Sequence, residues 1–427
     1  MSISSRNIFS RLLAPSAALV LVLTASAGLV RAGGPPEPND KVPGQYIVVL
    51  KDDAGDDEAV AAEMAAAHGL GILNSYGHAL HGFAAVIPEN RLERVKSDVR
   101  VAFVSEDRLV SASGKPGGSG TVPPAQIVPT GVSRVAAQAN ANKGAGIGVA
   151  VLDTGIDLTH PDLAANIVAG KNCLTTKKNA NDDNGHGSHV AGIIAALDNS
   201  VGVVGVAPRA KLAAVKVLNA QGSGTWSSII CGLDWVSANA AALNLKVVNM
   251  SLSGAGASDG NCGLTINDAL HRAICRVRDA GVTVVVAAGN SGASAAAEVP
   301  AAYDDAVITV SALADSDGLA GGLGAATAYG ADDTLASFSN YGPVVDLAAP
   351  GVNIRSTWKG GAYNIISGTS MAAPHVAGAA ALYLQAHPGS TWSQVRDGLT
   401  AAGEPSGAGH SDPSGLHPEP VVQAGAL

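Results

Sequence analysis

The stretch "GIGVAVLDTGID" (residues 146–157) contains a short apolar run that ends in an aspartate and a tight turn. Its apolar residues are consecutive rather than alternating with polar ones, which indicates a strand buried on both faces. Similar runs alternate with helical patterns downstream, at 212–218, 247–252, 282–290, 307–313 and 344–351. This alternation predicts an α/β fold with a mostly parallel central sheet and helices on both faces.

The composition of the chain limits its size class and its partners. The 427 residues are 47% hydrophobic and 4% aromatic, include 52 glycines and carry a net charge of −9. This length allows two or three domains with a large core. Because the sequence contains no basic patch or run of Lys and Arg, we do not expect nucleic acid as a partner.

Residues 1–32 have the pattern of a secretory signal peptide. Two arginines precede an apolar run that begins at Leu12, and small residues follow, with cleavage expected after Ala27 or Ala32. A membrane anchor is the alternative, which Pro15 and the borderline length of the run disfavour. We therefore expect a secreted, extracellular protein without a stable membrane anchor.

Patterns of composition divide the rest of the chain into four segments. Residues 44–113 predict a compact α+β domain, with strands at 45–50, 82–87 and 101–107 and helices at 57–69 and 89–98. A Gly/Pro/Ser-rich linker follows at 114–124. The α/β domain then spans 125–402, and the Pro/Gly-rich residues 403–427 predict a surface tail with at most one closing element.

Four cysteines in an exported chain predict two disulfides. Cys262 and Cys275 flank one short segment, and their pairing would leave Cys173 and Cys231 to pair across a longer loop. The sequence does not choose among the three possible connectivities. Free buried thiols are the alternative.

Polar residues with the chemistry of acyl transfer stand at the ends of the predicted strands and at the starts of helices. Asp153 ends one strand, His186 begins a helix of small residues in "DDNGHGSHVAGIIAAL", and Ser370 begins another in "SGTSMA". Attack on a carbonyl needs a nucleophile, a base and a carboxylate that orients the base, which these three residues supply. Asn290 in "VVAAGNSG" offers a side-chain amide for the oxyanion.

These four stretches resemble the signature segments of the subtilisin-like serine proteases, the subtilases. The matching patterns are D-[ST]-G, H-G-[ST]-H-V-A-G, A-A-G-N and G-T-S-M-A-x-P, and residues 44–113 resemble the subtilase propeptide. The resemblance implies a secreted serine endopeptidase made as a self-processing zymogen and cut near Ser113. It also implies protein and peptide substrates, the propeptide as an intramolecular inhibitor, and a monomer.

The resemblance further implies a cleft in which the extended substrate backbone pairs with two enzyme strands. The expected substrate-binding residues are Gly222, Ser223, Gly224, Trp226, Ser251, Leu252, Ser253, Gly254, Ala288 and Gly289. Trp226 stands where the family often has an aromatic wall for the P4 side chain. Glu298 either reaches the base of the S1 pocket, where it would favour a basic P1 residue, or points to solvent.

A structural Ca²⁺ is the cofactor that the resemblance implies. The stretch "AALDNSVGV" (residues 195–203) resembles the calcium loop of the family. The expected ligands are Asp162, Leu197, Asn199, Val201 and Val203, through carboxylate, amide and carbonyl oxygens that suit calcium. Gln126 is a candidate for a further ligand, and a loop without metal is the alternative.

Several other interpretations of the same residues remain. Ser370 can be a helix cap, and His186 with His189 can be read as a zinc pair, although no third ligand is nearby. A lipase-type G-x-S-x-G elbow is disfavoured because Ala372 follows Ser370 by two positions. At the level of function, the alternatives are a catalytically silent binding protein of the subtilase fold and an esterase or acyltransferase. If His186 is the base, rates should rise on the acid side of neutrality.

Overall fold

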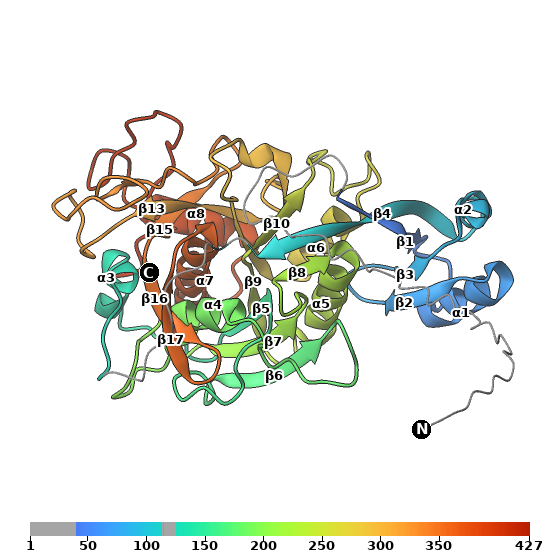
Figure 1. Cartoon of the computed structure of the whole chain (residues 1–427), viewed down its shortest axis with the longest axis horizontal. Helices are drawn as coiled ribbons and strands as arrows, with labels where there is room; N and C mark the ends of the chain where they lie inside the picture. Colours follow the sequence, from blue (N-terminus) through green and yellow to red (C-terminus); the bar gives the residue numbers. More distant parts are fainter. Residues whose placement is uncertain (1–39, 113, 115–124) are drawn as a thin grey trace, which may run out of the picture. The chain divides into compact units, whose positions relative to one another are not determined.

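The computed structural model describes residues 40–112, 114 and 125–427 (Figure 1). The predicted signal peptide, Ser113 and nearly all of the predicted linker lie outside the described residues. Within the described ranges, no helix is both long and apolar enough to cross a membrane.

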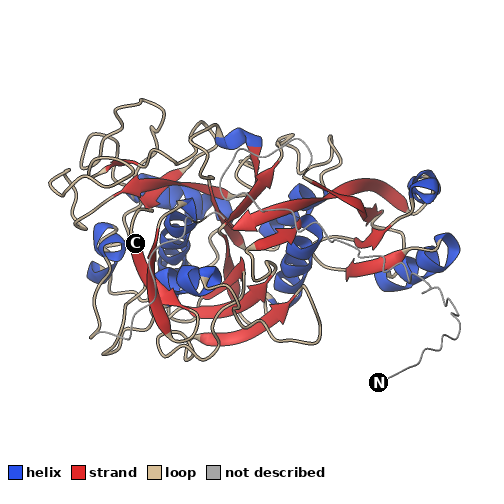
Figure 2. Ribbon diagram, in the orientation of Figure 1, coloured by secondary structure: helices blue, strands red, loops and turns tan. Residues whose placement is uncertain are grey.

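The core of the larger part of the chain is an eight-stranded sheet (Figure 2). Its strands follow the order β14 (Thr334–Leu335), β13 (Ile308–Ala314), β11 (Thr283–Ala287), β9 (Leu245–Met250), β5 (Gly148–Asp153), β7 (Lys211–Lys216) and β6 (Ile167–Asn172), and β15 (Leu347–Pro350) also pairs with β13. The β13–β14 pair is antiparallel, and the other described pairs of this sheet are parallel. The predicted mostly parallel sheet is therefore confirmed.

The central strands of this sheet, β5, β7, β9 and β11, each supply side chains to two apolar layers. In β5, Val149 and Val151 pack in the layer that contains α4 and α7, while Ala150 and Leu152 pack in the layer that contains α5 and α6. Successive side chains of a strand point to opposite faces, so a continuous apolar run fills both layers. The helices are α4 (His186–Ala195), α5 (Trp226–Asn239), α6 (Ala269–Asp279) and α7 (Thr369–Ala386), with α3 (Thr130–Arg134), α8 (Trp392–Ala402), η1 (Ala137–Ala139) and η2 (Ala295–Ala297) around them.

The N-terminal residues form a smaller antiparallel α+β unit, as the sequence predicts. It comprises β1 (Lys41–Leu50), α1 (Asp57–His68), β2 (Gly71–Tyr76), β3 (Gly82–Val86), α2 (Glu89–Lys96) and β4 (Val101–Ala112). Val48, Met64 and Phe83 are fully buried in its own apolar core. The sequence missed β2 because this strand contributes one buried residue, Tyr76, and has no continuous apolar run.

Strand β4 extends from this unit into the larger part of the chain. Its last residues pair antiparallel with β8 (Ser223–Thr225) on one side and with β10 (Leu252–Ala255) on the other. Val110 lies opposite Gly224, and Ser111 lies opposite Ser253. Beyond β10 the sheet continues to β12 (Glu298–Val299), while β16 (Ile354–Trp358) and β17 (Ala362–Ile366) form a separate hairpin.

The C-terminal residues 403–427 pack more extensively than the surface tail expected from their Pro and Gly content. Val421 is fully buried and pairs with Ala348 of β15. Glu404 accepts a hydrogen bond from the buried Arg134 at 2.7 Å. The few apolar residues of this segment are concentrated at its end, so the composition of the segment as a whole does not reveal them.

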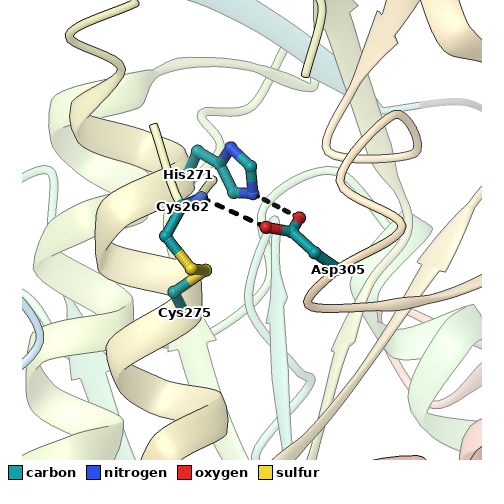
Figure 3. Close-up of side chains that lie close together, drawn as sticks. All are labelled: Cys262, His271, Cys275 and Asp305. Carbon is teal, nitrogen blue, oxygen red and sulfur yellow. Dashed lines mark hydrogen bonds and ion pairs between the residues drawn. A yellow bond between two sulfur atoms is a disulfide. The ribbon is translucent and has the colours of Figure 1, made fainter. Parts of the chain in front are cut away.

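The four cysteines form two disulfides, Cys173–Cys231 and Cys262–Cys275. The second disulfide lies beside His271, which is buried, and Asp305, which is partly buried (Figure 3). Asp305 accepts hydrogen bonds from His271 Nε2 at 2.6 Å and from the backbone N–H of Cys262 at 3.1 Å. Because the two sulfur atoms are bonded to each other, they are not available as thiolate ligands, and we interpret this cluster as a structural cross-link.

Candidate active site

The end of β5 and the start of α4 bring Asp153 and His186 together. Nδ1 of His186 lies 2.8 Å from Oδ1 and 2.9 Å from Oδ2 of Asp153, and Asp153 is fully buried. This close approach requires Gly187, since a Cβ there would lie 2.1 Å from the carbonyl oxygen of Gly155. The buried carboxylate therefore fixes the orientation of the imidazole.

The electrostatic environment makes His186 a stronger base than an ordinary histidine. Burial disfavours the imidazolium, but the charge of Asp153 and its hydrogen bond outweigh burial, so the pKa of His186 lies above its ordinary value of 6.5. The more distant Asp182 acts in the same direction. A raised pKa strengthens the ability of the neutral ring to accept a proton.

Ser370 lies in the first turn of α7, a helix that packs against α4. The N-cap of α7 is Gly368, so the interpretation of Ser370 as a helix cap is wrong. The Ser370 hydroxyl donates to the carbonyl oxygen of Ser251 at 3.1 Å. His186 Nε2 is buried and has no hydrogen-bond partner among the described residues, so the structure does not show a Ser–His hydrogen bond. Catalytic hydrogen bonds often tighten only when substrate is bound.

Asn290 is held beside the start of α7. Its Oδ1 accepts hydrogen bonds from the backbone N–H of Thr369 at 2.9 Å and from the Thr369 hydroxyl at 3.0 Å. Two donors on one side-chain atom identify that atom as the amide oxygen. The hydrogen-bonding pattern therefore directs the amide oxygen toward Thr369 and establishes Nδ2 as the donor end of the side chain.

The sequence analysis missed a second carboxylate that organises this site. Asp182 Oδ1 accepts from the Thr154 hydroxyl and from the backbone N–H of Gly185, both at 2.9 Å. Asp182 Oδ2 accepts from the backbone N–H and the hydroxyl of Ser188, at 2.9 and 2.7 Å. Asp182 thus ties the turn after Asp153 to the first turn of α4. The acidic pair before "NGHGSH" was the available signal.

The last residues of β4 occupy the cleft that was predicted for substrate. The backbone N–H of Ala112 donates to the carbonyl oxygen of Gly222 at 2.8 Å. Two residues further on, a Cβ built on Gly114 would lie 3.1 Å from Nε2 of His186. The chain that leaves β4 therefore passes directly against the imidazole.

The structure also places the other predicted cleft residues. Trp226 shares an apolar cluster with Val110 of β4. A Cβ on Gly289 would lie 2.4 Å from Oε2 of Glu298, whose Oε1 accepts from the Ser291 hydroxyl at 3.0 Å. Because Glu298 is 5% exposed, the alternative in which it points to solvent is wrong.

The loop expected to bind calcium is assembled around Asp162. Its Oδ1 accepts from Asn199 Nδ2 at 2.8 Å and its Oδ2 accepts from the backbone N–H of Val203 at 3.0 Å. The backbone N–H of Leu197 donates to the carbonyl oxygen of Asp162 at 2.9 Å. Gln126 Oε1 accepts from the backbone N–H of Asn199 at 2.6 Å, so this candidate ligand reaches the same loop. These contacts bring Asp162 beside Asn199, Leu197 and Val203, and the groups that face the Asp162 carboxylate in this loop are N–H donors. Carboxylate and amide oxygens are ligand types that suit a hard cation such as calcium.

A different acidic cluster was not predicted. Asp315, Asp317 and Asp332 each offer a carboxylate oxygen, and these three atoms lie within 4.8 Å of one another. Such a cluster could hold a metal ion.

Two further histidines near the site belong to the core. The His189 Nε2 donates to the carbonyl oxygen of Ile354 at 3.0 Å, and the His375 Nδ1 donates to the carbonyl oxygen of Met371 at 2.8 Å. Burial lowers the pKa of His189 to about 3 and that of His375 to about 4. Both rings are therefore neutral near pH 7 and serve as hydrogen-bond donors to the backbone.

Comparison with known proteins agrees with this geometry. The sequence model of the Subtilase family matches residues 144–412, and that of peptidase inhibitor I9 matches residues 45–113. The chain is 40% identical to Subtilisin E of Bacillus subtilis (strain 168) over 323 residues, which cover 74% of each protein. It is 46% identical to Subtilisin Savinase of Lederbergia lenta over 275 residues, which cover 64% of this chain and 89% of that relative. A crystal structure of a cold adapted subtilisin-like serine proteinase matches with a TM-score of 0.55 and 34% identity, covering 69% of this chain and 97% of that one.

Proposed function

Because the chain belongs to the subtilase family, we propose that Asp153, His186 and Ser370 are the catalytic triad of this serine endopeptidase, with Asn290 as the oxyanion donor. One observation carries the assignment. The chain that leaves β4 is hydrogen-bonded in the cleft and passes Gly114 against Nε2 of His186. A peptide bond presented in this way is within reach of a base that Asp153 already orients.

The mechanism follows from the properties of these groups. His186 Nε2 takes the proton of the Ser370 hydroxyl as its oxygen attacks the peptide carbonyl, and the charge of Asp153 stabilises the imidazolium. The Asn290 amide and the backbone N–H of Ser370 donate to the oxyanion. His186 then protonates the leaving amine, and water releases the acyl group from Ser370. For the attack, the Ser370 hydroxyl must leave the carbonyl oxygen of Ser251 and turn toward His186.

The propeptide strand indicates how substrates bind. We propose that residues 222–226 and 251–254 pair with an extended substrate as they pair with β4. Trp226 would bound the P4 side chain, and Ala288 with Gly289 would line the S1 pocket. The inhibitor I9 propeptide is a partner of the peptidase, and its last strand pairs with β8 and β10, the two strands that we propose bind substrate.

The proposal also covers how the chain is processed, where it is exported and how many copies form the mature enzyme. We propose a signal peptide at 1–32, a propeptide at 44–113 with the cut near Ser113, a linker at 114–124, a peptidase domain at 125–402 and a C-terminal segment at 403–427. Two disulfides support export to an oxidising compartment. We propose that the mature enzyme acts as a monomer.

A serine-reactive phosphonate probe tests this function directly. The processed enzyme should take up one probe, and peptide mapping should place the label on Ser370. A catalytically silent binding protein would remain unlabelled. An esterase or acyltransferase would be labelled but would cleave ester substrates while leaving matched peptides intact.

We expect Glu298 to favour basic P1 residues, because its carboxylate is buried against Gly289 at the predicted base of S1. Glu298→Gln should lower kcat/KM for a P1 Arg substrate about tenfold or more relative to a P1 Leu substrate, since close charge pairs couple by about 1.5 kcal/mol or more. The comparison of matched peptides in both enzymes measures this ratio. Asp304→Asn, a change at an exposed acid, serves as the control. An unchanged ratio in Glu298→Gln would show that its carboxylate does not set the P1 preference.

We propose that the loop around Asp162 binds a structural Ca²⁺ through Asp162, Asn199 and the carbonyl oxygens of Leu197, Val201 and Val203. For the inactive Ser370→Ala chain, the Tm measured with chelator should be roughly 5–10 °C lower than the Tm measured with calcium at about 100-fold its Kd. Chelation should lower the Tm of Asp162→Asn by less than it lowers that of the parent. Asp279→Asn, a change at an exposed position, should lose as much Tm on chelation as the parent does. Equal decreases in Asp162→Asn and the parent would exclude this loop as the site.

A further inference from the structure

The loop between β13 and β14 has buried carboxylates at both of its ends. Asp315 directly follows β13, and Asp332 lies two residues before β14. Asp317, close to the first end, is exposed to solvent. One oxygen of each carboxylate lies within 4.8 Å of the other two. The antiparallel pairing of β13 with β14 brings these sequence-distant ends together.

One oxygen in this cluster is buried without a partner. Asp315 is 1% exposed, and its Oδ2 has no hydrogen-bond partner among the described residues. Its Oδ1 accepts from the backbone N–H of Gly318 at 2.9 Å. The oxygens of Asp332, which is also buried, accept from the backbone N–H groups of Ser316 and Gly324, both at 2.7 Å. A buried, unpaired carboxylate oxygen is costly, so this site is suited to a positively charged ligand.

Nearby cationic side chains are engaged elsewhere. Arg134 donates to Asp333 and to Glu404, both at 2.7 Å, and His410 Nδ1 lies 2.9 Å from Glu404. Among the described residues, no ion pair reaches Asp315, Asp317 or Asp332. Burial raises the pKa of Asp315 to about 7; the charges of Asp333 and Asp332 act in the same direction, and the hydrogen bond from Gly318 and the charge of Arg134 oppose them. The charge of Arg134 favours the ionised form of Asp315, but Arg134 forms its ion pairs with Asp333 and Glu404 and not with these three carboxylates.

We propose that Asp315, Asp317 and Asp332 bind a calcium ion that ties together the two ends of this loop. The donors are carboxylate oxygens, which suit calcium, and the cluster offers no nitrogen or sulfur ligand that would favour zinc. Asp332, but neither Asp315 nor Asp317, also lines a cavity of about 280 Å³, together with Gly321, Gly322, Asp333 and residues 407–411. This cavity leaves room for water ligands on the Asp332 side of the cluster.

The proposed ion would also stabilise the C-terminal segment through the loop. The backbone N–H of Gly321 donates to the carbonyl oxygen of Gly409 at 2.8 Å. The backbone N–H of Ser411 donates to the carbonyl oxygen of Asp333 at 2.9 Å. Loss of the ion should therefore loosen both the loop and residues 407–411. The proposal does not depend on the assignment of the triad.

Counting bound ions tests the site. The full Ser370→Ala chain, which avoids self-digestion, is stripped with chelator and equilibrated with Ca²⁺, and the ions bound per chain are measured by equilibrium dialysis. Asp332→Asn should bind one ion fewer than the parent. If Asp162 holds a separate ion, the Asp162→Asn/Asp332→Asn double variant should bind one fewer than either single variant. An Asp332→Asn chain that binds as many ions as the parent, with the same Kd, would overturn the proposal.

A substitution at an exposed ligand provides a second test that does not depend on the folding of the Asp332→Asn chain. Asp317→Asn changes an exposed side chain and should weaken binding of that ion about tenfold or more, since affinity follows the number of charged ligands. Asp397→Asn, at an exposed position of α8, should bind Ca²⁺ as the parent does. If Asp317→Asn folds and binds with unchanged affinity, the cluster is not the site. In chains that retain Ser370, loss of this ion should leave the initial kcat unchanged, which separates failure of this site from failure of the active site.

Discussion

Ser370→Ala should keep its propeptide and lose nearly all peptidase activity. Removing the hydroxyl removes the atom that attacks the carbonyl, and His186 then has no nucleophile to activate. We expect kcat to fall about 10⁵–10⁶-fold, a magnitude taken from the corresponding change in a subtilisin. Intact mass followed over time, from a chain that starts at Gly33, should show propeptide release in the parent and none in the variant.

A neighbouring serine provides the matched control for this experiment. Ser367 lies between β17 and α7, and its hydroxyl accepts a hydrogen bond from the backbone N–H of Asn353 at 2.8 Å. Ser367→Ala should process itself, because the same chemical change there leaves the nucleophile in place. If Ser370→Ala releases its propeptide at the parental rate, another protease makes the cut. If neither chain is processed and the parent cleaves no peptide, the silent binding protein becomes the better description.

The arrangement of the sheet could be predicted because its signal is local. The runs that became β5, β9 and β11 are mostly apolar, and all but one of the residues in these strands are buried. Polar residues such as Asp153 and Asn290 interrupt this pattern where each run ends, at the edge where sites form in parallel sheets. The same logic failed for β2, whose residues are mostly exposed.

The parts that the sequence did not reveal depend on contacts between distant segments. In the sequence, nothing distinguishes Asp182 from an ordinary acidic loop residue. Its role depends on the fold, which places the hydroxyl of Thr154 beside it. Asp315 and Asp332 are separated by a glycine-rich loop, and their proximity appears only once β14 pairs with β13. The hydrogen bond between Ser370 and Ser251 depends on a side-chain rotamer, which no sequence pattern specifies.

Asp153→Asn should reduce kcat about 10⁴-fold while leaving the fold intact, as the equivalent change does in a serine protease with the same triad. The Asn side chain presents an N–H donor to Nδ1 of His186, which favours the tautomer that carries its proton on Nε2. In that tautomer Nε2 has no lone pair to accept the proton of Ser370. Asp183→Asn, in which the altered carboxylate pairs with Lys216 rather than with the imidazole, should retain most of the activity.

The pH dependence of the two enzymes should also differ. His186 acts as a base when neutral, so kcat/KM should rise as pH increases through the pKa of His186, which the structure places above 6.5. In Asp153→Asn the charge that raises this pKa is gone, and burial, which lowers it, remains. The inflection of the residual activity should therefore move to lower pH. An inflection at the same pH in both enzymes would show that a group other than the Asp153–His186 pair controls the rate.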